Sequence, residues 1–254
     1  MAGIRSLVKH STIYGMGSLL SKLLGFLLLP IYTRYLTPAD YGILSLLFIM
    51  GSVADILVRV GLGSAIFREV IYRGSDESQV ESTALYFLAA ESALFFGIFL
   101  FLSPLVSRLI FGSPTYARWL SIIFASSLLG IADHIALAKL RIHQQSLLFA
   151  TISVGKFLAG TLLNIYFIVI LRWGVKGLVI CSLAQAALSA GLSLVLIISD
   201  LKLTFSMPIL RRMLSFGIPL VPNGLSPSLD ELRGSLFLTT LLYHRRGRAL
   251  LARV

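Results

Sequence analysis

The chain has 254 residues, of which 57% are hydrophobic and only 13% are charged, and it carries a formal net charge of +11. Soluble domains contain about 25% charged residues, so this composition excludes that class. The apolar residues gather in runs of about 20, the length of a membrane-spanning helix, whereas barrel strands would alternate over about 10 residues. We therefore predict an all-α fold, a polytopic transmembrane bundle of six to seven helices.

The apolar runs predict the helices, and prolines mark several of the connections. Pro38, Pro104, Pro114 and Pro208 are expected to stop or start helices at the membrane interface. In chain order, the predicted helices are 11–32, 41–66, 83–103, 117–138, 148–171, 174–198 and one from 213 onward.

Basic residues lie in the loops between these runs and form no basic domain with interleaved aromatic residues, which argues against nucleic acid as a partner. The loops on the side of the N-terminus carry more Lys and Arg than the loops on the other side, a bias typical of cytoplasmic loops. We therefore predict a multi-pass protein of the inner (cytoplasmic) membrane with its N-terminus in the cytoplasm.

Nothing in the sequence favours an enzyme. Cys181 is the only cysteine, so an intrachain disulfide and a multi-thiolate metal site are excluded. The four histidines are dispersed, and the sequence contains no HExxH, GxSxG or Walker A motif. We predict no catalytic residue, no metal and no cofactor.

The first predicted helix carries a lysine, Lys22, near its middle. A charge at the centre of a bilayer costs roughly 2.5 to 3.5 kcal/mol on insertion scales, so an ionisable residue there predicts a function. Small and polar residues recur with Lys22 at spacings of three and four, which places them on one helix face. They are Ser11, Gly15, Ser18 and Gly25.

Three further helices have a similar polar face. Asp55 and Arg59 stand four apart and can form an internal ion pair or line a cavity. Lys22 and Lys156 have no acidic residue three or four positions away, which predicts a cationic cavity where water or an anionic ligand balances the charge, although Lys156 can also reach the headgroups. Small residues alone would only indicate close helix packing. The polar faces are Ser52, Asp55, Arg59 and Gly63; Ser153, Lys156, Gly160 and Asn164; and Ser182, Gln185, Ser189 and Ser193.

Two other sites carry ionisable groups. Glu91 in the third helix is either an ion-coupling carboxylate or an interfacial acid. Asp133 and His134 in the fourth helix form either a proton relay or an interfacial helix cap.

The segment GSLLSKLLGFLLLPIYTRYLTPADYGILSLL and the later GLGSAIFRE resemble the N-terminal part of polysaccharide-biosynthesis flippases, the Wzx-like branch of the MATE-like MOP superfamily. The link from Leu29 to Gly42 is the most specific part. Segments 173–188 and 213–222 resemble the sixth and seventh helices of that family, and the resemblance covers residues 8 to 225.

The resemblance implies one lobe of a two-lobed transporter that moves an undecaprenyl-diphosphate-linked oligosaccharide by alternating access. It implies that Lys22 and Arg59 line the cationic cavity that receives the diphosphate. The implied partners are the lipid-linked oligosaccharide, membrane lipids, a glycan polymerase and glycosyltransferases. A cation-coupled exporter of the same superfamily and a non-transporting scaffold or decayed gene product are the alternatives.

The sequence departs from that family near residue 225. Members of the family run to about twelve helices, whereas residues 1–225 account for one lobe and residues 226–254 read as a basic tail that breaks the orientation rule. We expect a truncated or frameshifted product, and a half-size protein that dimerises is the alternative.

Overall fold

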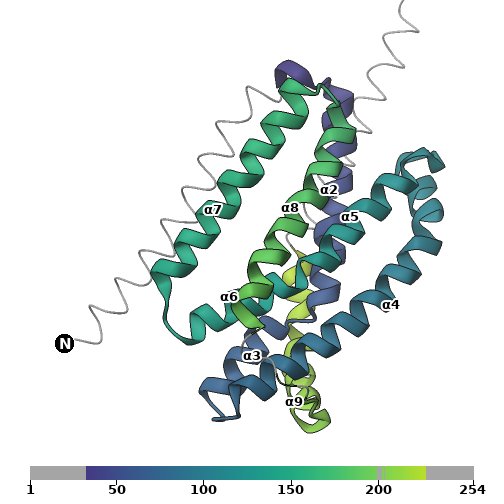
Figure 1. Ribbon diagram of the computed structural model, residues 1–254. Coiled ribbons are helices and arrows are strands. Elements are labelled where there is room, and N and C mark those ends of the chain that lie inside the picture. Colours follow the sequence, from purple (N-terminus) through teal and green to yellow (C-terminus); the bar gives the residue numbers. More distant parts are fainter. Residues whose placement is uncertain (1–32, 199–201, 203, 227–254) are drawn as a thin grey trace, which may run out of the picture.

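The computed structural model describes residues 33–198, 202 and 204–226, and helices are the regular secondary structure of these ranges (Figure 1). The predicted helix 11–32, which contains Lys22, and the predicted tail from 227 lie outside the described residues. The α-helices are α2 (Pro38–Arg59), α3 (Leu62–Ile71), α4 (Glu77–Phe111), α5 (Ala117–Leu129), α6 (Ile131–Ile142), α7 (Ser146–Ile165), α8 (Gly174–Ile197) and α9 (Met207–Gly217), with shorter turns at Pro114–Tyr116, Tyr166–Ile170 and Ile218–Leu220.

Five helical segments of the described part are long and apolar enough to cross a membrane. Each has at least 24 residues, which at about 1.5 Å per residue exceeds a hydrocarbon core of about 30 Å. The structure thus confirms the predicted all-α, multi-pass fold. The five segments are Pro38–Ile71, Glu77–Phe111, Pro114–Ile142, Ser146–Ile170 and Gly174–Ile197.

The prediction that the third helix ends before Pro104 is wrong, because α4 continues to Phe111. Proline lacks the N–H that would bond the carbonyl of Leu100, one turn earlier. The hydroxyl of Ser103 donates to that carbonyl at 3.0 Å, which satisfies it inside the membrane. The helix therefore passes through the proline and ends at Gly112, whose φ is +69°.

The second predicted helix, 41–66, is broken into α2 and α3. Val60 and Gly61 both have positive φ, 45° and 68°. At this break the backbone meets the end of α9: a Cβ on Gly61 would collide with the carbonyl of Gly217, and a Cβ on Gly217 would collide with the carbonyl of Val60. Two backbones therefore touch with no side chain between them.

We expect Gly61→Ala to destabilise the chain by roughly 2 to 3 kcal/mol, the sum of the cost of a left-handed alanine and of the overlap with Gly217. Thermal unfolding in detergent measures the loss. Gly63→Ala is the matched control, because nothing lies within 4 Å of its added Cβ. The control should leave stability unchanged or slightly raised, and equal losses in both variants would contradict this interpretation.

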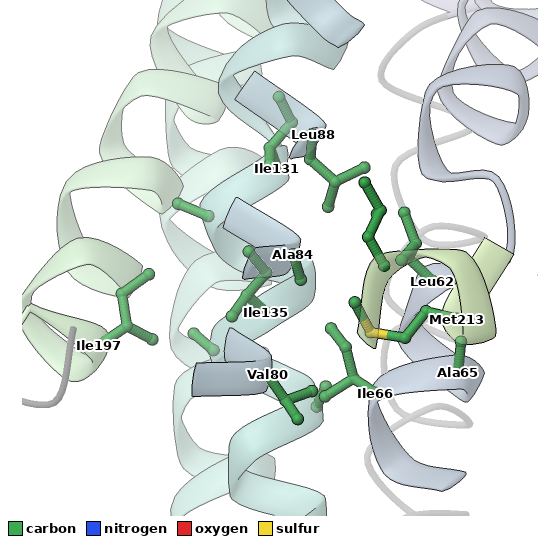
Figure 2. Close-up of a cluster of buried hydrophobic side chains, with 14 of the residues drawn as sticks. Leu62, Ala65, Ile66, Val80, Ala84, Leu88, Ile131, Ile135, Ile197 and Met213 are labelled. Atoms are coloured by element: carbon green, nitrogen blue, oxygen red, sulfur yellow. The ribbon is translucent and has the colours of Figure 1, made fainter. Parts of the chain in front are cut away.

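Two hydrophobic cores hold the helices together. One lies among α2, α5 and α8, around Leu47, Phe124 and Val179. The other joins α3, α4 and α6 to α9, and Figure 2 shows Met213 of α9 beside Leu62 and Ile66 of α3. The buried residues of α9 recur at helical spacing, so this short helix packs one apolar face on the bundle. They are Ile209, Leu210, Met213 and Gly217.

Ion pairs and hydrogen bonds also hold α9 against the bundle, at the end where it packs on α3 and α4. We call this the α9 end. The buried carboxylate of Glu69 accepts from Arg212 Nε at 2.7 Å, and Ser75 Oγ donates to it at 3.1 Å. The backbone before α9 is also attached to α4, since Ser206 N donates to Thr83 Oγ1 at 3.2 Å. The predicted seventh helix, from 213 onward, begins earlier in the structure: α9 starts at Met207, and helical residues continue through the turn Ile218–Leu220 to residue 226, the last of that described range.

Candidate functional site

Two charged residues of α2 meet a histidine of α6 inside the bundle. The guanidinium of Arg59 forms an ion pair with Asp55, four residues earlier on the same helix face. The second carboxylate oxygen, Asp55 Oδ1, lies 3.4 Å from His134 Nε2. The side chain of Arg59 is 45% exposed and that of Asp55 only 24%, so the guanidinium is the accessible member of the pair.

A second ion pair joins α6 to α7 and α8. Lys156 on α7 pairs with Asp133, in the first turn of α6. The ammonium also donates to Ser193 Oγ at 2.9 Å, and that hydroxyl donates to Asp133 Oδ1 at 2.8 Å. Counting along the sequence finds no partner for Lys156, because the carboxylate comes from a neighbouring helix.

These groups line a cavity of about 410 Å³, which we call the polar cavity. It brings together residues of three predicted polar faces, which come from α2, α7 and α8. Its ionisable residues are two carboxylates, two cations and one histidine, and its described lining is therefore balanced rather than cationic as predicted. The lining residues from the predicted faces are Ser52, Asp55, Arg59, Lys156, Ser182, Gln185 and Ser189.

A larger cavity of about 810 Å³, the basic cavity, lies between α3, α6 and the end of α9. Arg59 and His134 line both cavities. Arg68 and Arg141 add two guanidinium groups, and none of the described residues that line this cavity is acidic. The sequence analysis did not predict Arg68 and Arg141 as site residues, because it counted them only among the loop charges that set membrane orientation. Their positions in the last turns of two helices are the signal that could have identified them.

Glycine brings the walls of the polar cavity close together. A Cβ on Gly160 of α7 would overlap the amide of Gln185 on α8, and one on Gly51 of α2 would overlap the side chain of Ile123 on α5. Gly160 thus allows close packing, the ordinary role of small residues in membrane helices. Gly63, predicted on the face of Asp55, instead lines the basic cavity, because the break at Gly61 turns α3 away from the course of α2.

Glu91 stands apart from these groups. It lies in the middle of α4, because the helix begins at Glu77 and not at residue 83 as predicted. It lines neither cavity, and one of its carboxylate oxygens is buried without a hydrogen-bond partner among the residues that the structure describes. Its ion-coupling role stays a prediction.

Comparisons with solved structures show which fold these helices form. A MATE transporter in complex with Br-NRF superposes with a TM-score of 0.66 at 20% identity, covering 88% of this chain and 55% of that one. A MOP superfamily transporter from Pyrococcus furiosus, described as having a binding pocket of reverse polarity, gives 0.68 at 18% identity, with 88% and 53% covered. An outward-facing multidrug resistance MATE transporter gives 0.63 at 17% identity, with 87% and 51% covered.

The chain therefore has the fold of part of a MOP superfamily transporter, and it spans about half the length of these solved proteins. A comparison with curated proteins found no match. A family model described as polysaccharide biosynthesis protein matches residues 31–241, which extends past the residue 225 where the sequence resemblance stops. By this match over most of its length, the chain belongs to the polysaccharide biosynthesis protein family.

Proposed function

We propose that this chain forms the N-terminal lobe of a flippase that moves an undecaprenyl-diphosphate-linked oligosaccharide across the cytoplasmic membrane, with the N-terminus in the cytoplasm. The family match supports a role in polysaccharide biosynthesis, and the fold supports a transporter rather than an enzyme. The observation that carries the proposal is the position of Arg59, which lines both the basic and the polar cavity.

Arg59 can exchange one anionic partner for another. Asp55 neutralises Arg59 within a membrane-spanning segment, which keeps the cost of the charge low. A guanidinium binds carboxylate and phosphate oxygens alike with two parallel hydrogen bonds, and a diphosphate carries more negative charge than one carboxylate, so it can replace Asp55 as the partner. Release from Asp55 would couple binding of the lipid diphosphate to a rearrangement of the polar cavity, and rocking of two lobes would then carry the substrate across.

The proposal also assigns roles to the two lysines and names the proposed partners. We expect Lys22 to face the same substrate, while Lys156 is held by Asp133 and serves to order the polar cavity. The proposed partners are membrane lipids and the glycan polymerase and glycosyltransferases that make and use the lipid-linked oligosaccharide.

We expect Arg59→Ala, alone or with Lys22→Ala, to reduce flipping about tenfold or more, because charge-assisted hydrogen bonds to phosphate are lost. The measurement is surface polysaccharide in cells that depend on this protein, or on a full-length member of the family aligned with it, together with its level in the membrane. Arg108→Ala is the matched control, since Arg108 lines neither cavity. Normal polysaccharide with Arg59→Ala would contradict the assignment.

A cation-coupled exporter is the second candidate. It is favoured by the two carboxylates in the polar cavity, Asp55 and Asp133, which can attract a cation when Arg59 or Lys156 moves away. Reconstitution in liposomes separates the two: turnover of a lipid-linked glycan supports the flippase, and export of a cationic drug without such turnover supports the exporter.

A further inference from the structure

The basic cavity lies where two membrane-spanning segments end. Arg68 and Arg141 are in the last turns of α3 and α6, and the spans that contain them end at Ile71 and Ile142. The ends of spanning helices lie near the lipid headgroups, whose phosphates form the plane of negative charge nearest to the hydrocarbon. We therefore expect the two guanidinium groups to lie near the depth of the lipid phosphates.

Neither guanidinium is neutralised by the described part of the chain, in which no carboxylate forms an ion pair with Arg68 or Arg141. Carboxylates are nevertheless present at the α9 end, where they pair with cations outside the basic cavity. Glu81 lies 3.5 Å from Lys139, and Glu69 binds Arg212. The acids at this end thus leave Arg68 and Arg141, unlike Arg59, without a carboxylate partner among the described residues and able to bind an external anion.

Aromatic rings hold both guanidinium groups in place. The Cζ atom of Arg68 lies 4.4 Å from the centroid of Phe216, and that of Arg141 lies 5.1 Å from the centroid of Phe149. Stacking uses the face of a guanidinium and leaves the N–H donors at its edge available for oxyanions. The donors are therefore ordered before a ligand arrives, which lowers the entropy that binding costs.

Most of the other lining side chains are apolar. Leu62, Ile66 and Leu88 from α3 and α4 line the cavity together with Ile135 and Leu137 from α6. A free inorganic anion would gain nothing from these walls, whereas a lipid would place its phosphate on the arginines and part of its glycerol or acyl chain on the apolar side chains.

We propose that the basic cavity binds the phosphate group of an anionic membrane lipid, with Arg68 and Arg141 as its ligands. The same cavity contains Arg59, so Arg68 and Arg141 add two ligands to the site of the proposed function, but lipid binding at these two residues does not require transport. Two sources share the chemistry: a bulk phospholipid such as phosphatidylglycerol, and the diphosphate of a polyprenyl lipid held by Arg68 and Arg141 in the cavity that Arg59 also lines.

The test measures lipid binding directly on the purified full chain in neutral detergent. Native mass spectrometry counts bound molecules during titration with phosphatidylglycerol, with a polyprenyl diphosphate, and with zwitterionic phosphatidylcholine as the reference lipid without net charge. Arg68→Ala/Arg141→Ala is expected to weaken binding of the anionic lipids about tenfold or more. Arg108→Ala/Arg211→Ala removes the same charge from residues outside the cavity and should bind as the unchanged chain does.

The results separate the sources. Loss of phosphatidylglycerol binding assigns the site to bulk lipid, and loss of polyprenyl diphosphate binding alone assigns it to the transported lipid. Unchanged binding in the cavity variant, or an equal loss in the control, would overturn the proposal.

The conservative pair Arg68→Lys/Arg141→Lys keeps the charge but removes the two-pronged geometry. It should bind with intermediate affinity, and it serves as the test if the alanine pair does not fold. Lysine variants that bind as tightly as the unchanged chain would rule out the arginines as specific ligands. Because binding is read without transport, a failure here leaves the flippase proposal to its own experiment.

Discussion

Asp133→Asn is expected to lower the free energy of unfolding by about 3 to 5 kcal/mol, the usual cost of removing one partner from a buried ion pair. The variant leaves the Lys156 ammonium without a carboxylate in a site where its side chain is only 12% exposed. Lys156→Met should cost a similar amount, because it leaves the Asp133 carboxylate unpaired. Unfolding by heat or by denaturing detergent, monitored by circular dichroism, measures both losses.

The double variant Asp133→Asn/Lys156→Met decides whether the pair itself is responsible. It contains no unpaired charge, so its stability should return to within about 1 to 2 kcal/mol of the unchanged chain. Losses that simply add in the double variant would show that the two side chains do not interact.

Glu69→Gln is expected to release α9 from the bundle. Glu69 is 3% exposed, and its carboxylate holds Arg212, with Arg73 Nε at 3.7 Å. The variant leaves Arg212 without a partner, but this side chain is 38% exposed and water partly replaces the carboxylate, so the cost should be about 1 to 2 kcal/mol. Trypsin cleaves after arginine, so cleavage at Arg211 and Arg212 in limited proteolysis should become faster by about one order of magnitude.

Asp76→Asn is the matched control for Glu69→Gln. Asp76 pairs with Lys202 at 3.3 Å at the same end of the molecule, but both side chains are 57% exposed. Exposed pairs contribute about 0 to 1 kcal/mol, so cleavage at Arg211 and Arg212 should barely change. Equal acceleration in the two variants would show that α9 is held by its apolar face alone.

The sequence predicts the fold well because its signals are local. Runs of apolar residues of membrane length give the spanning helices between Pro38 and Ile197, and helical spacing places Ser52, Asp55 and Lys156 on the wall of one cavity. The predicted helix ends are wrong where a neighbouring side chain compensates for a residue that usually ends a helix. Pro104 does not end α4, because the hydroxyl of Ser103 replaces the missing hydrogen bond at Leu100.

The charge of the cavities could not be predicted from single helices. The cationic character expected around Lys156 is cancelled by Asp133, which lies 23 positions earlier on another helix. The basic cavity is cationic for a related reason: Glu69, the acid next to Arg68 in the sequence, pairs with Arg212, and Asp133, the carboxylate nearest to Arg141 in the sequence, pairs with Lys156. Which cations are left unpaired depends on the packing of several helices, so it cannot be predicted from the sequence of any single helix.

The contact between Gly61 and Gly217 gives the lobe a mechanical property. Side chains at a helix crossing can change rotamer and absorb a small displacement, but here two backbones meet directly. A displacement of the C-terminal end of α9 is therefore transmitted to the break between α2 and α3, and Arg59 is the last residue of α2 before that break. Among the described residues, the end of α9 is thus rigidly coupled to an arginine that lines both cavities.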